Sequence, residues 1–327
     1  MTVPSRPLAT STETRSRKRL ASIPRGLAAA IAGLLVLGSI AGCSPTGPAG
    51  SGAPDTVQVV TTTTILADLV SQVGGSHVSV ESLVPKGGEV HTFDPTPSDA
   101  RRLASADLVF LNGLGLDAWL EQLVESSGTD APVVALAEQL DGVTYLAGEH
   151  EGEAVNPHLW LNLQYAVKYV ERIAAQLAQI DPTHAPDYEA ALAGYRTQLE
   201  ALDAKARDTL GAIPEANRTV ITFHDAFPYF AAAYGLRIDG TIVDAPGQDP
   251  SAGEMAALIR VVREQGVRAI LAEAQFNDEL ARTIAEETGA VVVSELYTGS
   301  VGDPPQDTYA GAMTWNVEQI AAALGGG

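Results

Sequence analysis

The chain has 327 residues, of which 20 are Lys or Arg and 40 are Asp or Glu, so its formal net charge is −20 at pH 7. A chain of this length is too long for one small core and predicts two compact domains. The acidic balance argues against nucleic acid as a partner, because phosphate backbones require clustered Lys and Arg side chains.

The first 42 residues have the features of a secretory signal peptide. Basic residues at 15–25 precede an apolar run at 26–40, which is short for a membrane span and ends in small residues. Cys43, the only cysteine, follows in a setting that resembles the lipobox of bacterial lipoproteins. We expect cleavage before Cys43 and a lipid on it, the alternative being a buried thiol behind a signal anchor. Residues 43–55 then form a lipidated flexible linker.

Strands and helices alternate in the sequence that follows. Strands are predicted at 57–62, 78–84, 106–111 and 132–136, and helices at 65–73, 98–105 and 117–124. This alternation indicates an α/β fold, in which a mostly parallel sheet is flanked by helices. Binding sites in such folds lie beyond the carboxyl ends of the strands.

Two long helices are predicted in the middle of the chain, at 163–180 and 185–212, separated by Asp181 and Pro182. The second has one apolar stripe, made of Tyr188, Leu192, Tyr195, Leu199, Leu202, Ala206 and Leu210. At about 1.5 Å per residue this helix would be roughly 40 Å long, enough to bridge two domains. The alternative is a short coiled-coil seam between two copies of the chain.

The second half repeats the alternation. Strands are predicted at 218–223, 267–271 and 290–294, and helices at 225–234, 251–265, 277–288 and 309–324, with Ser251 and Glu254 forming a capping box. We therefore divide the chain into an N-terminal α/β lobe at 56–184, a connecting long helix at 185–213 and a C-terminal α/β lobe at 214–327.

Three histidines stand in distinctive local sequences. His91 follows a Gly-Gly pair and precedes two prolines, His158 lies in Asn-Pro-His-Leu-Trp, and His224 follows a strand at the start of a helix. Neutral imidazole is the commonest side-chain ligand of borderline divalent metals, and three such nitrogens with one oxygen donor suit tetrahedral zinc. Asp94 and Asp225 are candidate acceptors for the imidazole N–H groups, although Asp225 is equally suited to cap a helix.

These motifs together resemble one known family. Val84-Pro85-x-Gly-x-x-x-His91-Thr-Phe-x-Pro-x-Pro, Asn156-Pro-His158-Leu-Trp-Leu, Phe223-His224-Asp-Ala-Phe and Thr308-Tyr309 with Asn316 occur in the order found in the zinc and manganese substrate-binding lipoproteins of bacterial ABC transporters, the cluster A-I metal receptors. The resemblance covers most of residues 57–324. It implies two α/β lobes joined by a single long helix, with the metal held between them.

The resemblance also implies a function. His91, His158 and His224 match the positions of three metal ligands, and a histidine at 224, where manganese receptors are expected to have glutamate, favours zinc over manganese. The expected protein is an extracytoplasmic, lipid-anchored monomer that binds zinc with high affinity and delivers it to an ABC permease and its ATPase. It has no catalytic residues, and the chain contains no nucleotide-binding fingerprint.

The sequence departs from the family in two places. Gly299 occupies the position of an expected aspartate ligand, so Glu295, Glu273 or water could provide the fourth donor. The acidic loop at 148–153 contains one histidine, His150, and is either a shortened metal-collecting loop or a solvated turn. Two alternative functions stay open, a three-histidine zinc hydrolase and a manganese-selective receptor.

Overall fold

The computed structural model describes residues 56–148 and 154–326. The predicted signal peptide, Cys43, the linker and His150 lie outside these residues. No helix within the described ranges is both long and apolar enough to cross a membrane.

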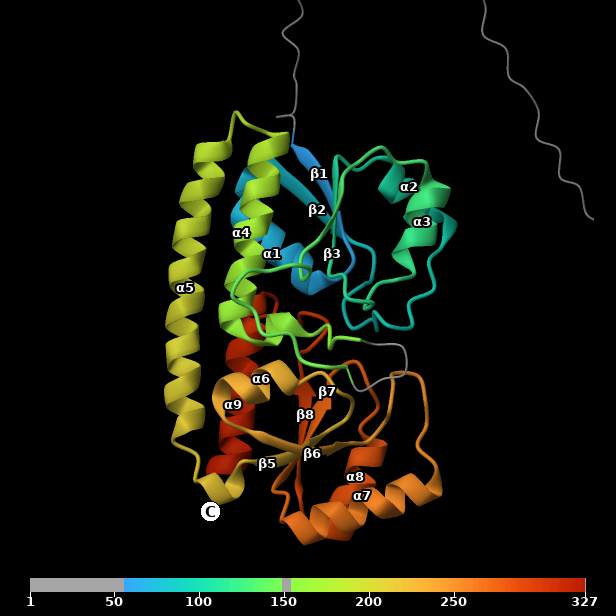
Figure 1. The fold of residues 1–327 in the computed structure, drawn as a ribbon, viewed down its shortest axis with the longest axis vertical. Coiled ribbons are helices and arrows are strands. Elements are labelled where there is room, and N and C mark those ends of the chain that lie inside the picture. Colours follow the sequence, from blue (N-terminus) through green and yellow to red (C-terminus); the bar gives the residue numbers. More distant parts are fainter. Residues whose placement is uncertain (1–55, 149–153, 327) are drawn as a thin grey trace, which may run out of the picture. The chain divides into compact units, whose positions relative to one another are not determined.

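The N-terminal lobe contains a four-stranded parallel sheet in the order β2-β1-β3-β4 (Figure 1). Its strands are β1 (Val57–Thr61), β2 (Val78–Ser82), β3 (Leu108–Leu111) and β4 (Val133–Ala135), and its helices are α1 (Thr64–Gly74), α2 (Pro97–Ala104), α3 (Leu120–Ser127) and α4 (Leu163–Ile180). Because side chains alternate along a strand, Val59 and Phe110 pack in the cluster that contains α1 and α4, whereas Val60 and Val109 pack with α2 and α3. Helices thus cover both faces of the sheet.

The C-terminal lobe repeats this plan with the strand order β6-β5-β7-β8, again all parallel. Its strands are β5 (Thr219–Thr222), β6 (Arg237–Thr241), β7 (Ala269–Glu273) and β8 (Val291–Leu296), and its helices are α6 (Pro228–Tyr234), α7 (Ala252–Gln265), α8 (Glu279–Thr288) and α9 (Tyr309–Gly325). The predicted fold class, two parallel sheets with flanking helices joined by one long helix, is confirmed. The lobe boundaries at residues 184 and 213 stay a prediction.

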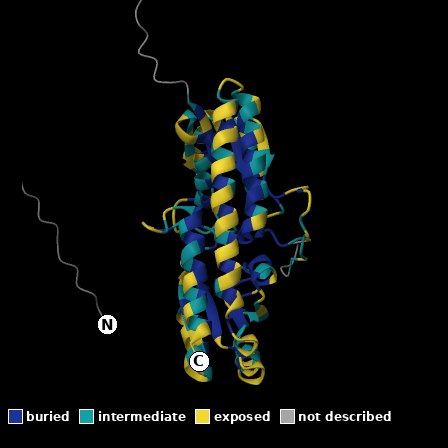
Figure 2. Ribbon diagram, turned by 90° about the vertical axis from the view of Figure 1, so that its left-hand side faces the viewer, coloured by how far each residue is buried: buried dark blue, intermediate teal, exposed yellow. Residues whose placement is uncertain are grey.

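The connecting helix is α5 (Ala185–Gly211), which packs against α1 and α4 of the first lobe and against α6 and α9 of the second. The predicted apolar stripe faces these helices, while the opposite side of α5 is exposed (Figure 2). The coiled-coil alternative is wrong, because the stripe is already buried within the chain. Asp203 also lies on the buried side of α5 and accepts hydrogen bonds from Gln164 of α4 and Tyr234 of α6.

Two predictions for the C-terminal lobe are wrong. Strand β6 was not predicted, because its sequence Arg-Ile-Asp-Gly-Thr lies at a sheet edge, is partly exposed and has no apolar run. Helix α6 begins at Pro228 rather than at residue 225, since the amide of Ala226 bonds the carbonyl of His224 in a turn and proline suits the first helical position. Asp225 therefore does not cap this helix.

One apolar cluster contains residues from both lobes, from Val57 of β1 to Leu324 of α9. Tyr309, the first residue of α9, is fully buried in it. Its hydroxyl donates a hydrogen bond to the carbonyl of Trp160, and its amide donates to Asp68 of α1 at 2.8 Å. Tyr309 thus ties the last helix of the chain to the first lobe.

We expect Tyr309→Phe to lower the free energy of unfolding by about 1–3 kcal/mol, because a buried carbonyl loses its donor. Urea denaturation of the two proteins measures this difference. Tyr195→Phe is the matched control, since the buried hydroxyl of Tyr195 has no hydrogen-bond partner among the described residues, and its removal should be neutral or stabilising. Equal losses in both variants would contradict the assignment.

Candidate metal centre

The three predicted histidines lie together in space. His91 lies on the loop after β2, His158 directly precedes a 3-10 turn (Leu159–Leu161), and His224 follows β5. Nε2 of His158 lies 3.3 Å from Nε2 of His91 and 3.4 Å from Nε2 of His224. One donor atom from each of the three lies within 4.8 Å of the others. Residues separated by more than 60 positions therefore form one cluster of donors.

The spacing of these nitrogens fits a tetrahedral ion. With zinc–nitrogen distances of 2.0–2.1 Å, two ligands of a regular tetrahedron lie about 3.3 Å apart. The measured separations of 3.3 and 3.4 Å match this edge. An ion would thus need little movement of the rings.

The cluster lines a cavity of about 10 Å³, close to the volume of one water molecule or one ion. His158 and His224 are only 3% and 1% exposed, whereas His91 is half-buried. Gly299, Gln275, Thr298, Trp160, Val90 and Glu89 complete the wall. The site is too small for an organic substrate, and its size limits the occupant to a single ion.

The ring of His158 is oriented by Asn156. The Asn156 side-chain oxygen lies 3.2 Å from Nδ1 of His158 and accepts the His158 amide at 3.0 Å. The Asn156 amide group in turn donates to the carbonyl and the carboxylate of Asp225. Asn112 donates to the carbonyl of Pro157 and fixes the same loop from the other side. With Nδ1 engaged, Nε2 of His158 faces the cavity.

His224 is oriented by Glu273, the last residue of β7. A carboxylate oxygen of Glu273 lies 2.8 Å from Nδ1 of His224, and both side chains are buried. Burial is the largest single effect and lowers the pKa of His224, but the charge and hydrogen bond of Glu273, together with the charges of Glu89 and Asp225, outweigh burial and raise this pKa above its ordinary value. Glu273 was predicted as a possible fourth ligand. Its carboxylate contacts Nδ1 of His224, whereas Nε2 of this ring faces His158, and a ligand role for Glu273 stays a prediction.

The His91 loop is fixed by contacts on both sides. The indole of Trp119 donates to the carbonyl of Val90 at 2.8 Å. Towards the C-terminal lobe, Lys86 forms an ion pair with Asp303, and the amide of Gly87 donates to the hydroxyl of Ser300 at 2.8 Å. Contacts to the segment after β8 thus hold this loop against the loop that contains Gly299.

The other predicted donors have different roles. Glu295 is exposed and does not line the cavity, and its predicted role as a fourth ligand stays a prediction. Asp94 is exposed, and the carboxylate of Asp225 accepts a hydrogen bond from Asn156. Sequence reasoning missed Glu89, which lines the cavity. Its position two residues before His91 was the available signal.

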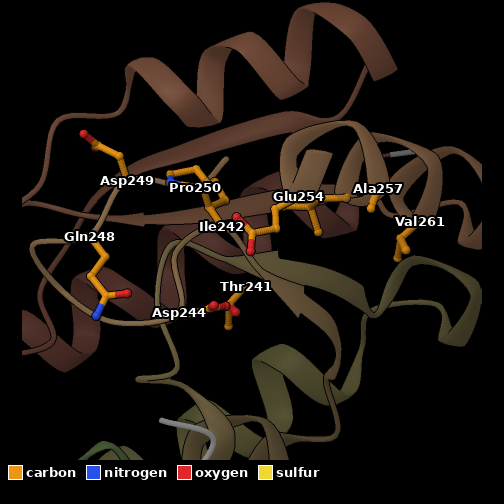
Figure 3. Close-up of a pocket in the computed structure, with 10 residues that line it drawn as sticks. Thr241, Ile242, Asp244, Gln248, Asp249, Pro250, Glu254, Ala257 and Val261 are labelled. Atoms are coloured by element: carbon orange, nitrogen blue, oxygen red, sulfur yellow. The ribbon is translucent and has the colours of Figure 1, made fainter. Parts of the chain in front are cut away.

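A wider hollow of about 340 Å³ lies in the C-terminal lobe, beside β6 and α7 (Figure 3). Asp244, Asp249 and Glu254 contribute carboxylates to it, and no histidine lines it. Within residues 56–148 and 154–326, the three-histidine cluster is the only group of three or more His, Cys, Asp or Glu side chains close enough together to share a metal ion.

Comparison with known proteins agrees with this geometry. The family described as "Zinc-uptake complex component A periplasmic" matches residues 59–323. The chain belongs to this family.

Several relatives of this receptor are named metal-binding proteins. It is 31% identical to the metal ABC transporter substrate-binding lipoprotein FimA of Streptococcus parasanguinis, over 94% of this chain and 99% of that protein. It is 32% identical to the manganese-binding lipoprotein MntA of Halalkalibacterium halodurans, over 84% and 94%. The solved structure of the periplasmic zinc-binding protein TroA from Treponema pallidum has a TM-score of 0.75 and 28% identity, and the match covers 82% of this chain and 99% of that one.

Membership of this family establishes what kind of protein the chain is. The protein is an extracytoplasmic metal-binding receptor of an ABC uptake system, and it is a substrate-binding protein rather than an enzyme. The zinc hydrolase alternative is therefore excluded. The metal is the cargo of this receptor, either zinc or manganese.

Proposed function

We propose that this receptor captures zinc with the Nε2 atoms of His91, His158 and His224 and delivers it to an ABC permease driven by a cytoplasmic ATPase. The single observation that supports this most strongly is the pair of nitrogen separations, 3.3 and 3.4 Å, in a cavity of about one ion's volume. Glu273 and Asn156 hold the outer nitrogens of two rings, as is usual for histidines that bind metal.

The choice of zinc rests on donor chemistry. Imidazole suits zinc, whereas carboxylate and water suit manganese. The names of the relatives point both ways, since MntA is called manganese-binding and TroA zinc-binding. In this chain the third histidine, His224, and the absence of a side chain at Gly299 both reduce the number of hard oxygen donors.

Metal analysis of the purified protein tests the proposal. After equilibration with defined concentrations of zinc and manganese together, we expect about one zinc per chain and little manganese. His91→Ala should lose the bound zinc. Manganese retained in preference to zinc would establish the manganese-selective alternative.

Gly299→Asp should shift selectivity towards manganese. A Cβ at this position would meet only Gln275, at 3.7 Å, so the cavity wall can accommodate a side chain there. A new carboxylate adds a hard donor, and we expect the ratio of manganese to zinc affinity to rise about tenfold or more. Competition of the two ions for wild type and variant measures this ratio, and an unchanged ratio would show that residue 299 does not control selectivity.

We also propose that Cys43 carries the lipid that anchors the receptor to the cell membrane. The lipobox-like setting of Cys43 and the word lipoprotein in the names of FimA and MntA support this role. Cys43→Ala should move the protein from the membrane fraction to the soluble extracytoplasmic fraction without changing its affinity for zinc. Membrane retention of this variant would contradict the proposal.

A further inference from the structure

Tyr229 of α6 contacts a distant segment of the chain, the one that precedes His158. The side chain of Tyr229 is buried, with only 1% of its surface exposed. Its hydroxyl donates a hydrogen bond to the carbonyl of Asn156 at 3.0 Å and accepts the amide of Leu146 at 3.0 Å. The amide of Asn156 also donates to the carbonyl of Leu146 at 2.9 Å. One hydroxyl therefore bonds to both members of a backbone pair.

The hydroxyl of Tyr229 keeps both hydrogen bonds at neutral pH. Burial raises its pKa to about 12, so the phenol stays protonated and can donate and accept at once. The ring of Tyr229 meets the ring of Tyr165 edge to face, with centroids 5.9 Å apart. Tyr165, on α4, bonds to a different residue, since its hydroxyl accepts the amide of Thr144 at 3.1 Å. The two tyrosines are thus neighbours with separate backbone partners.

Asn156 connects Tyr229 to the metal centre. It is fully buried, and its peptide groups bond to Tyr229 and Leu146. Its side-chain oxygen accepts the amide of His158 at 3.0 Å and lies 3.2 Å from Nδ1 of the same residue. Because the backbone and the side chain belong to one residue, a rotation of the Asn156 peptide group would move the oxygen that orients His158.

We infer that Tyr229 is a positioning residue for the metal centre, which fixes the peptide group of Asn156 so that the Asn156 side chain keeps the ring of His158 directed towards the ion. This inference rests on the proposed function. Tyr229 lies on the helix that follows His224, so the segment that carries one histidine also orients another. Removal of the hydroxyl should change the geometry of the site without removing any donor atom.

Zinc competition titrations of Tyr229→Phe test the inference. The substitution removes one hydroxyl, keeps the ring in the core and leaves all three imidazoles in place. We expect zinc affinity to fall about tenfold, the lower end of the 10–100-fold range for groups that orient metal ligands, because Tyr229 acts through a second residue. Tyr165→Phe, which removes the neighbouring hydroxyl, should bind zinc as the wild type does. Circular dichroism checks that both variants are folded.

A double-mutant cycle with Asn156→Ala distinguishes positioning from a general loss of structure. If Tyr229 acts through the Asn156 side chain, Tyr229→Phe should cause no further loss of zinc affinity once that side chain is absent. Losses that multiply in the double variant would show that the two residues act independently, and this result overturns the inference.

Nitrogen NMR of the metal-free protein gives a second measurement, because it reports which nitrogen of the His158 ring carries the proton. We expect the His158 signals to change in Tyr229→Phe and to stay unchanged in Tyr165→Phe. Unchanged signals in Tyr229→Phe overturn the inference, as does wild-type zinc affinity in this variant. The proposed function fails separately, if His158→Ala binds zinc as the wild type does.

Discussion

Replacing His158 with alanine should greatly weaken zinc binding. His158 lies at the centre of the cluster, within 3.4 Å of both other Nε2 atoms, so its loss leaves two nitrogens and an enlarged cavity. We expect affinity to fall by more than about 100-fold, since the loss of groups that merely orient ligands already costs about 10–100-fold. Titration of the metal-free protein against a chromophoric chelator measures the change.

A second histidine provides the control for this experiment. His77 lies outside the cluster, where it stacks on His184 with ring centroids 3.9 Å apart and pairs with Asp187. His77→Ala removes an imidazole of the same type and should leave zinc affinity unchanged. If both alanine variants lose zinc equally, the cause is a general loss of structure, and circular dichroism would detect it.

The second large effect is on pH dependence. A protonated imidazole cannot bind metal, so zinc and protons compete for His224. Burial lowers the pKa of His224, but Glu273, with smaller contributions from Glu89 and Asp225, raises it above its ordinary value, so this competition begins at a higher pH than for an ordinary histidine. We expect affinity to be greatest above the pKa of His224 and to fall as pH decreases from about 7.5 to 5.5, by about tenfold per unit for each proton displaced.

Glu273→Gln separates this mechanism from a general effect of acid. Without the negative charge, burial dominates and the pKa of His224 falls, so the loss of zinc should move to lower pH. At high pH the variant should bind more weakly than the wild type, because a neutral amide makes the ring less basic. An affinity that is flat across this pH range in the wild type, or an unchanged midpoint in the variant, would contradict the role of Glu273.

The sequence predicted the three imidazoles because each lies in a short motif that can be read locally. It also predicted most helices and strands, whose apolar residues recur at helical or strand spacing. Strand β6 had no such pattern, since an edge strand buries little. Glu89 lines the cavity and Glu273 lies behind the ring of His224. Their positions beside His91 and at a strand end gave only a weak signal, because an isolated glutamate near a strand is usually solvated.

The same limit applies to the role of Glu273. A carboxylate that ends a parallel strand was correctly expected near the site, but its partner depends on which nitrogen of His224 faces the cavity. That choice follows from packing in three dimensions, where β5 and β7 are neighbours although more than 40 residues separate them. Spacing in the sequence contains no information about ring orientation.

The shared interior of the two lobes has a thermodynamic consequence. Since α5 contributes side chains to an apolar cluster that extends from β1 to α9, neither half of the chain encloses a complete core. Heating should therefore melt residues 56–326 in one cooperative transition, with calorimetric and van't Hoff enthalpies equal, and a fragment truncated within α5 should not fold. A bound ion that stabilises either sheet would then protect amides of both from hydrogen exchange.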